Sequence, residues 1–179
     1  MDDHPCIRAM TPADCRPVAE IRVRGWQRAY AGMVPQPYLD ALDVAADTER
    51  RRHHLAHGGP EVAHLVAEHD GEIVGWACHG PYRDGAAPAG SAELYAIYVH
   101  GRHLSRGVGS ALLAESVRRC ATAGYGHMLL WVLKENLPAR RFYERRGFSP
   151  DGTEEPFEVD GVPVPEVRYV RVLTGDAPG

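Results

Sequence analysis

LSRGVGSALLAESVRRCATAG, residues 104–124, is the stretch of this chain that decides its fold. It joins a short glycine-containing loop to a segment with the spacing of an amphipathic helix, and the β-rich segment ELYAIYV (93–99) leads into it. A strand, a tight loop and a helix in this order form an anion site, because the unpaired N–H groups of the first helical turn and the positive end of the helix dipole face the loop. Gly107 and Gly109 lack a Cβ, so a bulky anion can approach the main chain. The sequence therefore predicts a site for a phosphate-bearing ligand at this loop.

The glycine spacing argues against two common classes of phosphate-binding protein. Ser110 follows Gly109 directly and no G-K-[ST] occurs in the chain, so the Walker A chemistry of an NTPase is missing. The third glycine of a dinucleotide-binding motif is replaced by Leu112, which argues against a dehydrogenase.

The loop instead resembles the acyl-CoA loop of the GNAT superfamily of N-acetyltransferases, Q/R-x-x-G-x-G/A, with Leu104 in place of Gln or Arg. A second stretch, NLPARRFYERRGF (136–148), resembles the GNAT signature N-x-x-A-x-x-F-Y-x-x-x-G-F at every signature position. Together the two motifs identify the chain as similar to a GNAT acetyl-CoA-dependent N-acetyltransferase, and the resemblance covers nearly the whole chain.

The resemblance implies a set of residues that bind acetyl-CoA. In that family the loop holds the phosphates, the strand before it pairs with the pantetheine arm, the signature Asn contacts that arm, and the signature Tyr lies near the thioester sulfur. Carried over, the cofactor-binding residues are Ile97, Val99, Leu104, Ser105, Arg106, Gly107, Val108, Gly109, Ser110, Asn136 and Tyr143.

Periodicity and turn residues predict an α/β (α+β) fold in one domain, residues 1–179, with a folded core at 5–173 and a frayed tail at 174–179. We expect strands at 7–10, 62–68, 73–78, 92–100, 127–133, 148–159 and 164–173, and helices at 11–30, 37–42, 44–57, the segment after Gly107, and 136–146. The resemblance implies that these strands form a mixed sheet of about seven strands with flanking helices, splayed between the fourth and fifth strands.

Acetyl transfer to an amine raises two proton problems. An alkyl amine with a pKa of ~10.4 is neutral in roughly one molecule in 2,500 at pH 7, so a base, desolvation or both are needed. Glu93 is the candidate base, acting directly or through water. Tyr143 is the candidate hydrogen-bond donor to the leaving thiolate. We expect direct attack of a primary amine in a ternary complex, without an acyl-cysteine.

Composition limits the partners. The net charge of −4 disfavours nucleic acid, and no apolar run of 18 residues or secretory leader is present, so we expect no membrane partner and a cytoplasmic protein. The acceptor is expected to be a small-molecule or peptide amine. By analogy with the family, a homodimer is expected, with 164–173 as a plausible interface.

Several residues allow more than one interpretation. Trp26 and Tyr30 either contact the substrate or pack in the core. His53 and His57 have the spacing of a zinc-binding pair, but Arg50, Arg51 and Arg52 surround them, so a solvated basic face without metal is expected. The chain as a whole is an enzyme, a CoA-binding sensor without transfer activity, or a transferase with another acyl group or acceptor.

Overall fold

The computed structural model of the chain describes residues 4–83 and 85–173; the predicted frayed tail at 174–179 lies outside the described residues. Its elements, in chain order, are β1 (Cys6–Ala9), a 3-10 turn (Pro12–Asp14), α1 (Cys15–Ala29), α2 (Gln36–Asp40), α3 (Val44–His57), β2 (Ala63–His69), β3 (Glu72–Pro81), β4 (Ser91–Val99), a 3-10 turn (Gly101–His103), α4 (Val108–Thr122), β5 (His127–Leu133), α5 (Leu137–Glu144), β6 (Ser149–Val159) and β7 (Val162–Val172).

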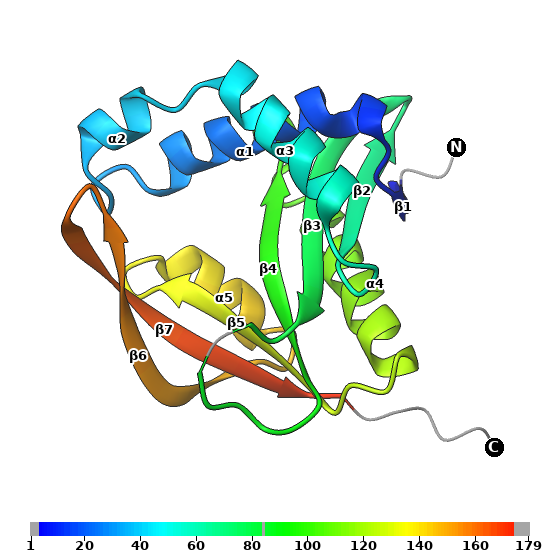
Figure 1. Cartoon of the computed structure of the whole chain (residues 1–179), viewed down its shortest axis with the longest axis vertical. Coiled ribbons are helices and arrows are strands. Elements are labelled where there is room, and N and C mark those ends of the chain that lie inside the picture. The colour runs from blue at the N-terminus through cyan, green and yellow to red at the C-terminus, as the bar shows by residue number, and fades with distance from the viewer. Residues whose placement is uncertain (1–3, 84, 174–179) are drawn as a thin grey trace.

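Within the described residues, seven strands form one sheet in the order β1-β2-β3-β4-β5-β7-β6 (Figure 1). The neighbouring strands are antiparallel except β4 and β5, which run parallel. That parallel pairing covers only Ser91–Glu93 against His127–Leu129, and the two strands then separate. The predicted mixed sheet, splayed between its fourth and fifth strands, is confirmed.

A β-bulge accompanies the separation of β4 from β5. The register of β3 against β4 shifts between the pairs Cys78–Ala96 and His79–Leu94, so Tyr95 is the extra residue on β4. A bulge bends its strand and increases its twist, and this one lies two residues after Glu93, the last residue paired with β5. Gly80 leaves room for it, since a Cβ there would lie 2.7 Å from the Tyr95 hydroxyl oxygen.

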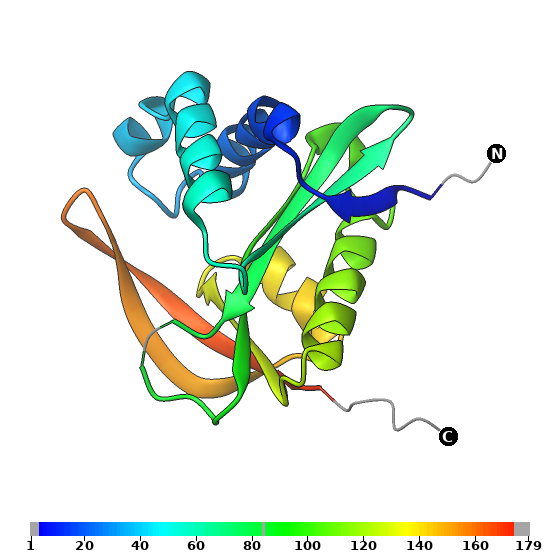
Figure 2. The ribbon, with the colours of Figure 1, turned by 45° about the vertical axis from the view of Figure 1, so that its right-hand side comes forward.

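Alternation along the strands separates two layers of helices (Figure 2). On one face, Val66 and Trp76 pack with Val18 of α1. On the other, Leu65 and Val74 pack with residues of α4, and a further cluster joins α4, α5, β5 and β7. The sheet therefore has an α1/α3 face and an α4/α5 face.

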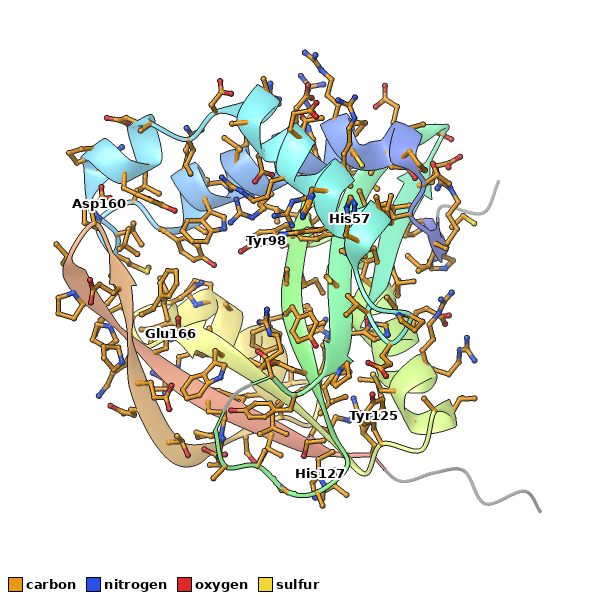
Figure 3. All side chains as sticks on the ribbon, in the orientation of Figure 1. His57, Tyr98, Tyr125, His127, Asp160 and Glu166 are labelled. Atoms are coloured by element: carbon orange, nitrogen blue, oxygen red, sulfur yellow. The ribbon has the colours of Figure 1, made fainter. Side chains whose placement is uncertain are left out.

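The β6–β7 hairpin reaches across to the first helices. Val159 and Val164, at the end of the hairpin, share a buried cluster with Trp26 of α1 and Leu39 of α2. Figure 3 shows Asp160, in the hairpin turn, beside α2. This contact encloses one end of the α1/α3 face.

The turn chemistry agrees with the predicted hairpins. Asp70 and Gly71 both have positive φ (52° and 77°), as do Asp160 and Gly161 (49° and 75°), which is the backbone of a type I′ turn. Gly147, predicted as a left-handed residue after α5, has φ of 83°. The first helix departs from expectation at its start, because a 3-10 turn precedes α1.

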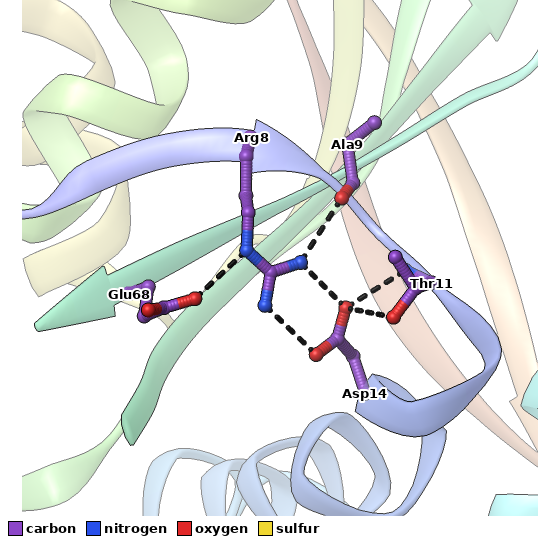
Figure 4. A network of polar contacts seen from close by, with 5 residues as sticks. All are labelled: Arg8, Ala9, Thr11, Asp14 and Glu68. Atoms are coloured by element: carbon purple, nitrogen blue, oxygen red, sulfur yellow. Dashed lines mark hydrogen bonds and ion pairs between the residues drawn. The ribbon is translucent and has the colours of Figure 1, made fainter. Parts of the chain in front are cut away.

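A polar network fixes that start (Figure 4). The Asp14 carboxylate accepts two hydrogen bonds from the Arg8 guanidinium, at 2.8 and 3.0 Å, and one from the Thr11 backbone N–H at 2.7 Å. Arg8 Nε also donates to Glu68 of β2 at 2.8 Å. These contacts, with the Arg8 hydrogen bond as the largest cause, lower the pKa of Asp14. The network joins β1, β2 and the beginning of α1.

We predict that Asp14→Ala lowers the free energy of unfolding by about 1–2 kcal/mol at pH 7, the range found for lost helix caps. Because the folded-state pKa of Asp14 is depressed, its contribution is present above the unfolded pKa and is lost as the pH falls through the folded value. Urea unfolding between pH 7 and pH 3 measures this. Glu20→Ala, which removes an exposed i,i+4 pair with Arg16, is the control and should change little; equal effects of the two variants would contradict the assignment.

Candidate active site

One cavity of about 1540 Å³ passes between the separated strands and has walls on both faces of the sheet. Its lining includes Gly107, Asn136 and Tyr143 from the α4/α5 side and Trp26 and Glu93 from the α1/α3 side. A molecule in this cavity can therefore be reached from both faces at the point where β4 leaves β5.

The α4/α5 side carries the predicted anion loop. Gly107, at φ 83°, is the N-cap of α4, a conformation that favours glycine, and no side chain caps this helix start. The first intrahelical bond runs from Ala111 N–H to Gly107 C=O, which leaves the earlier N–H groups of the turn without a helical acceptor. Of the predicted loop, the residues on the cavity wall are Leu104, Ser105, Gly107, Gly109 and Ser110. Arg106 lies off the wall, and the Val108 side chain is buried in the core, so Val108 offers its backbone alone.

Arginines of α5 and of the turn after it add positive charge beside this loop. Arg146 Nε donates to Ser110 Oγ at 3.1 Å, and its Nη2 also contacts that oxygen. Arg141 and Arg145 line the same cavity, and within the described residues no carboxylate pairs with these three cations. Burial first, and then Arg145, lower the pKa of Arg146. An anion at the loop would meet both backbone N–H groups and guanidinium charge.

The free edge of β4 matches the predicted role of Ile97 and Val99. His100 N–H bonds to Val74 O of β3, so by alternation the backbone groups of Tyr98 face β3 and those of Ile97 and Val99 face the opened side. Ile97 and Val99 both lie on the cavity wall. Arg28 Nη2 reaches the Val99 carbonyl at 3.5 Å. An extended ligand arm can pair with this edge as an added strand.

Tyr143 is buried on α5 and takes part in the core cluster, yet its ring also lines the cavity. Within the described residues its hydroxyl makes no hydrogen bond, and its ring contacts are aromatic, with Phe142, Phe148 and Tyr169. Burial, with a smaller effect of Tyr98, raises the pKa of Tyr143 well above the ordinary value. The hydroxyl therefore stays protonated at neutral pH and is able to donate.

Asn136 has a structural task of its own. Its side-chain Oδ1 accepts from Ala139 N–H at 3.4 Å, which makes it the N-cap of α5. It also lines the cavity, so capping and ligand contact are compatible.

Trp26 and Tyr30, for which the sequence allowed either substrate contact or core packing, contact a third aromatic residue, Tyr98 of β4. Trp26 Nε1 donates to the Tyr98 hydroxyl at 2.8 Å, and the Tyr30 hydroxyl lies 3.4 Å from it. All three line the cavity, while Trp26 also belongs to the buried cluster under the β6–β7 hairpin. They form an aromatic wall that is both core and cavity surface.

Glu93 faces the α1/α3 side, since Ala92 and Leu94 on either side of it pack in the opposite cluster. It is 5% exposed. Its carboxylate accepts from the Arg83 backbone N–H at 3.2 Å and from the Arg83 guanidinium at 3.1 and 3.4 Å.

Glu166 of β7, which the sequence analysis did not single out, is a second carboxylate on that face (Figure 3). It lies directly opposite Glu155 of β6, a like-charge pair that costs stability in an antiparallel ladder. Within the described residues it has no ion pair or hydrogen bond. Burial, then Glu155 and Glu93, raise its pKa to about 7.

Helix α3 gives one correction. His53, His54 and His57 are exposed, and the structure has no group of three or more metal-ligating side chains among the residues it describes. Arg50 and Arg52 are exposed as expected for a solvated face, but Arg51 is buried. It shares the inner face of α3 with Asp47 and Thr48, at i, i+1 and i+4 of a helix.

Residues 23–148 match the sequence profile of the Acetyltransferase (GNAT) family. A probable N-acetyltransferase of Mycobacterium tuberculosis is 31% identical over 179 residues, with 97% of this chain and 96% of that protein covered. A solved structure from Desulfovibrio desulfuricans, assigned to the GNAT family, superposes with a TM-score of 0.72 at 26% identity, over 95% of this chain and 99% of that one. The PaiA N-acetyltransferase of Thermoplasma acidophilum, solved with coenzyme A, has a TM-score of 0.71 at 19% identity, over 94% and 98%. The chain belongs to the GNAT acetyltransferase family.

Among the described residues, no helix has the length and apolar character needed to cross a membrane.

We predict that Glu166→Gln stabilises the fold at pH 8 relative to the wild type and has no such effect at pH 4. The raised folded-state pKa means that the stability associated with protonated Glu166 is present below its unfolded pKa and is lost as the pH rises through about 7, whereas Gln stays neutral. Urea unfolding across this range measures the difference. Glu158→Gln, the same charge change on exposed β6, is the control; an identical pH profile for both variants would contradict the buried, charge-crowded setting of Glu166.

Proposed function

We propose that the protein transfers the acetyl group of acetyl-CoA to a primary amine by direct attack in a ternary complex. The observation that carries this proposal is the cavity at the β4–β5 separation, which has an anion loop and the Tyr143 hydroxyl on one face and two carboxylates on the other. The uncapped start of α4, the arginines beside it and the free β4 edge fit a pyrophosphate and an extended amide arm.

The acceptor amine approaches from the α1/α3 face. In this proposal Glu93, which is paired with Arg83, draws the ammonium group into the cavity. Glu166 receives its proton, since a carboxylate with a pKa near the working pH and free lone pairs is the more effective base. The sequence-based prediction that Glu93 itself takes the proton is tested by the same variants below.

The remaining steps take place at the thioester, beside Tyr143 on the α4/α5 face. The neutral amine nitrogen forms the C–N bond, and the C–S bonding electrons leave on sulfur, which accepts a hydrogen bond from Tyr143. The nitrogen loses two protons in all. The first passes to Glu166 and from there to solvent, and the second matches the proton that the sulfur takes up as it becomes the CoA thiol. Acid and base thus stand on opposite faces of the sheet.

The expectations of a cytoplasmic location and of a homodimer stay predictions. Strand β7, which contains most of the predicted interface 164–173, pairs with β5 and β6 along its length. A dimer that shared this strand would therefore require β6 to leave the sheet.

The test of the function is release of CoA thiol from acetyl-CoA with a panel of amines: spermidine, kanamycin, L-amino acids and short peptides. Turnover with one class supports the proposal. Tight binding of acetyl-CoA without turnover by any amine would favour the sensor interpretation instead.

We predict that Tyr143→Phe lowers kcat by about 100-fold or more and leaves the affinity for CoA nearly unchanged. The variant removes the hydroxyl that donates to the leaving sulfur but keeps the buried ring and its aromatic contacts. Steady-state kinetics and calorimetric titration with CoA measure the two effects. An unchanged kcat would remove Tyr143 from the mechanism.

We predict that Glu166→Gln lowers kcat/KM by about 10²-fold or more and abolishes an acid-limb inflection near pH 7, because the protonated carboxyl cannot accept the amine proton. The variant should regain rate at high pH, where the amine deprotonates without help. Glu93→Gln should raise KM and retain the inflection. If Glu93→Gln abolishes the inflection and Glu166→Gln does not, Glu93 is the base.

A further inference from the structure

A buried surplus of positive charge lies between α1 and α3, outside the groups used so far. Asp47 is the shared carboxylate: Arg22 Nη1 lies 3.0 Å from Oδ1, Arg50 Nη1 lies 3.3 Å from the same oxygen, and Arg51 Nε lies 3.7 Å from Oδ2. The side chains of Asp47, Arg51 and Arg22 are 3%, 9% and 16% exposed, whereas that of Arg50 is 53% exposed. One buried cation, Arg51, and one partly buried cation, Arg22, therefore share one buried anion.

Arg51 is left without hydrogen-bond acceptors. Within the described residues none of its N–H donors makes a hydrogen bond, and its Nε is buried and unsatisfied, as is Asp47 Oδ2. The 3.7 Å separation is too long for a charge-assisted hydrogen bond, and Oδ1 is already shared by Arg22 and Arg50. A buried guanidinium in this state is costly unless a further anion completes it.

The surroundings have the electrostatics of an anion site. Burial, followed by the charge of Arg51, lowers the pKa of His64 to about 4 and also lowers the pKa of His54. His64 Nδ1 is a further buried polar atom without a hydrogen bond. Burial lowers the pKa of Arg51 itself, although Asp47 opposes this change. The charged and titratable groups around Arg51 are Arg22, Arg50, Asp47, His54, His64 and Cys78.

Both of these arginines face the acceptor side of the cavity. Arg22 and Arg51 line it, together with Trp76 and Tyr98. The Arg51 guanidinium lies 5.2 Å from the Trp76 ring centre, and Trp76 stacks on Tyr98 with 6.1 Å between ring centres. Tyr98 belongs to the aromatic wall beside the β4–β5 separation. The rings of Trp76 and Tyr98 therefore connect the Arg51 guanidinium to the proposed place of acetyl transfer.

We propose that Arg22 and Arg51 bind a carboxylate of the acceptor, so that the substrate is an amine that also bears an acidic group, such as an amino acid or a short peptide with a free C-terminus. The inference rests on the proposed function and adds the substrate class to it. The ammonium end lies toward Glu93 and Glu166, and the carboxylate end lies toward Arg51, so the cavity is polarised to match a zwitterion.

The experiment compares acetyl transfer to each acid with transfer to its amide. The probes are L-amino acids, the ω-amino acids glycine, β-alanine, 4-aminobutyrate and 6-aminohexanoate, and a tetrapeptide, each with its carboxamide. The wild type should favour the acid about 10- to 100-fold in kcat/KM, as expected for a hydrogen bond between charged groups. The ω-amino acid series reports the distance between the amine and the anion site. O-phosphoethanolamine against ethanolamine distinguishes a phosphate from a carboxylate.

The variants separate recognition from structure. Arg51→Gln should bring the acid-to-amide ratio close to one through a raised KM for the acids, and Arg51→Lys should restore part of the preference. Arg50→Gln removes a cation that touches the same Asp47 from the exposed side, and it should leave the ratio unchanged. Thermal unfolding and the affinity for CoA verify that each variant is folded.

The possible results point in different directions. Equal turnover of acids and amides by the wild type overturns the anion site and leaves the acetyltransferase proposal standing. A ratio that falls equally in Arg50→Gln and Arg51→Gln overturns the assignment of the site to Arg51, and a preference confined to the phosphate probe overturns the carboxylate as the group that is bound. Binding of acetyl-CoA without turnover of any amine overturns the proposed function, and the substrate class falls with it.

Discussion

The bulge at Tyr95 is the constraint on which the rest of this site depends. It comes two residues after Glu93, the last residue that β4 pairs with β5, and the β3–β4 ladder continues beyond it. The Tyr95 hydroxyl contacts the Pro81 carbonyl, and Gly80 makes space for the ring. Without this local change in twist, the β4 edge would be used by β5, and neither an extended ligand arm nor a cavity through the sheet would have room.

Because β4 and β5 separate, side chains from both faces of the sheet line the candidate site. Residues on one face of the sheet alternate with residues on the other, so Glu93 and Glu166 face α1 and α3, whereas Tyr143 approaches from α5. In the proposed mechanism the proton donor and the proton acceptor lie on opposite sides of the sheet, and the substrate lies between them. The Arg83 contact orients the Glu93 carboxylate, and burial beside like charges raises the pKa of Glu166 to about 7.

Local patterns predicted most of the fold and the α4/α5 half of the site. The anion loop, the strand edge at Ile97 and Val99, and Tyr143 all lie in contiguous motifs whose spacing carries the signal. The proposed acceptor half depends on contacts between segments that are distant in the sequence, and no short sequence motif predicts such contacts. Glu166 becomes a candidate only once β7 is paired with β5 and β6. Arg51 stands in a run of three arginines, and helical periodicity did not reveal that its side chain is buried beside Asp47, because the contact that joins Asp47 to Arg22 spans 25 positions of the sequence.

The contact between the β6–β7 hairpin and the first two helices gives the acceptor side a closed end. Val159 and Val164 pack with Trp26 and Leu39, and the Phe157 ring lies 6.2 Å from that of Trp26, so this boundary is built from the same apolar cluster that stabilises the fold. In the proposed complex, an acceptor that extends past this wall must displace it and expose the cluster to water, which raises the free energy of the complex. On that proposal the hairpin limits the length of the acceptor, and selection by size follows from how the β6–β7 hairpin packs against α1 and α2.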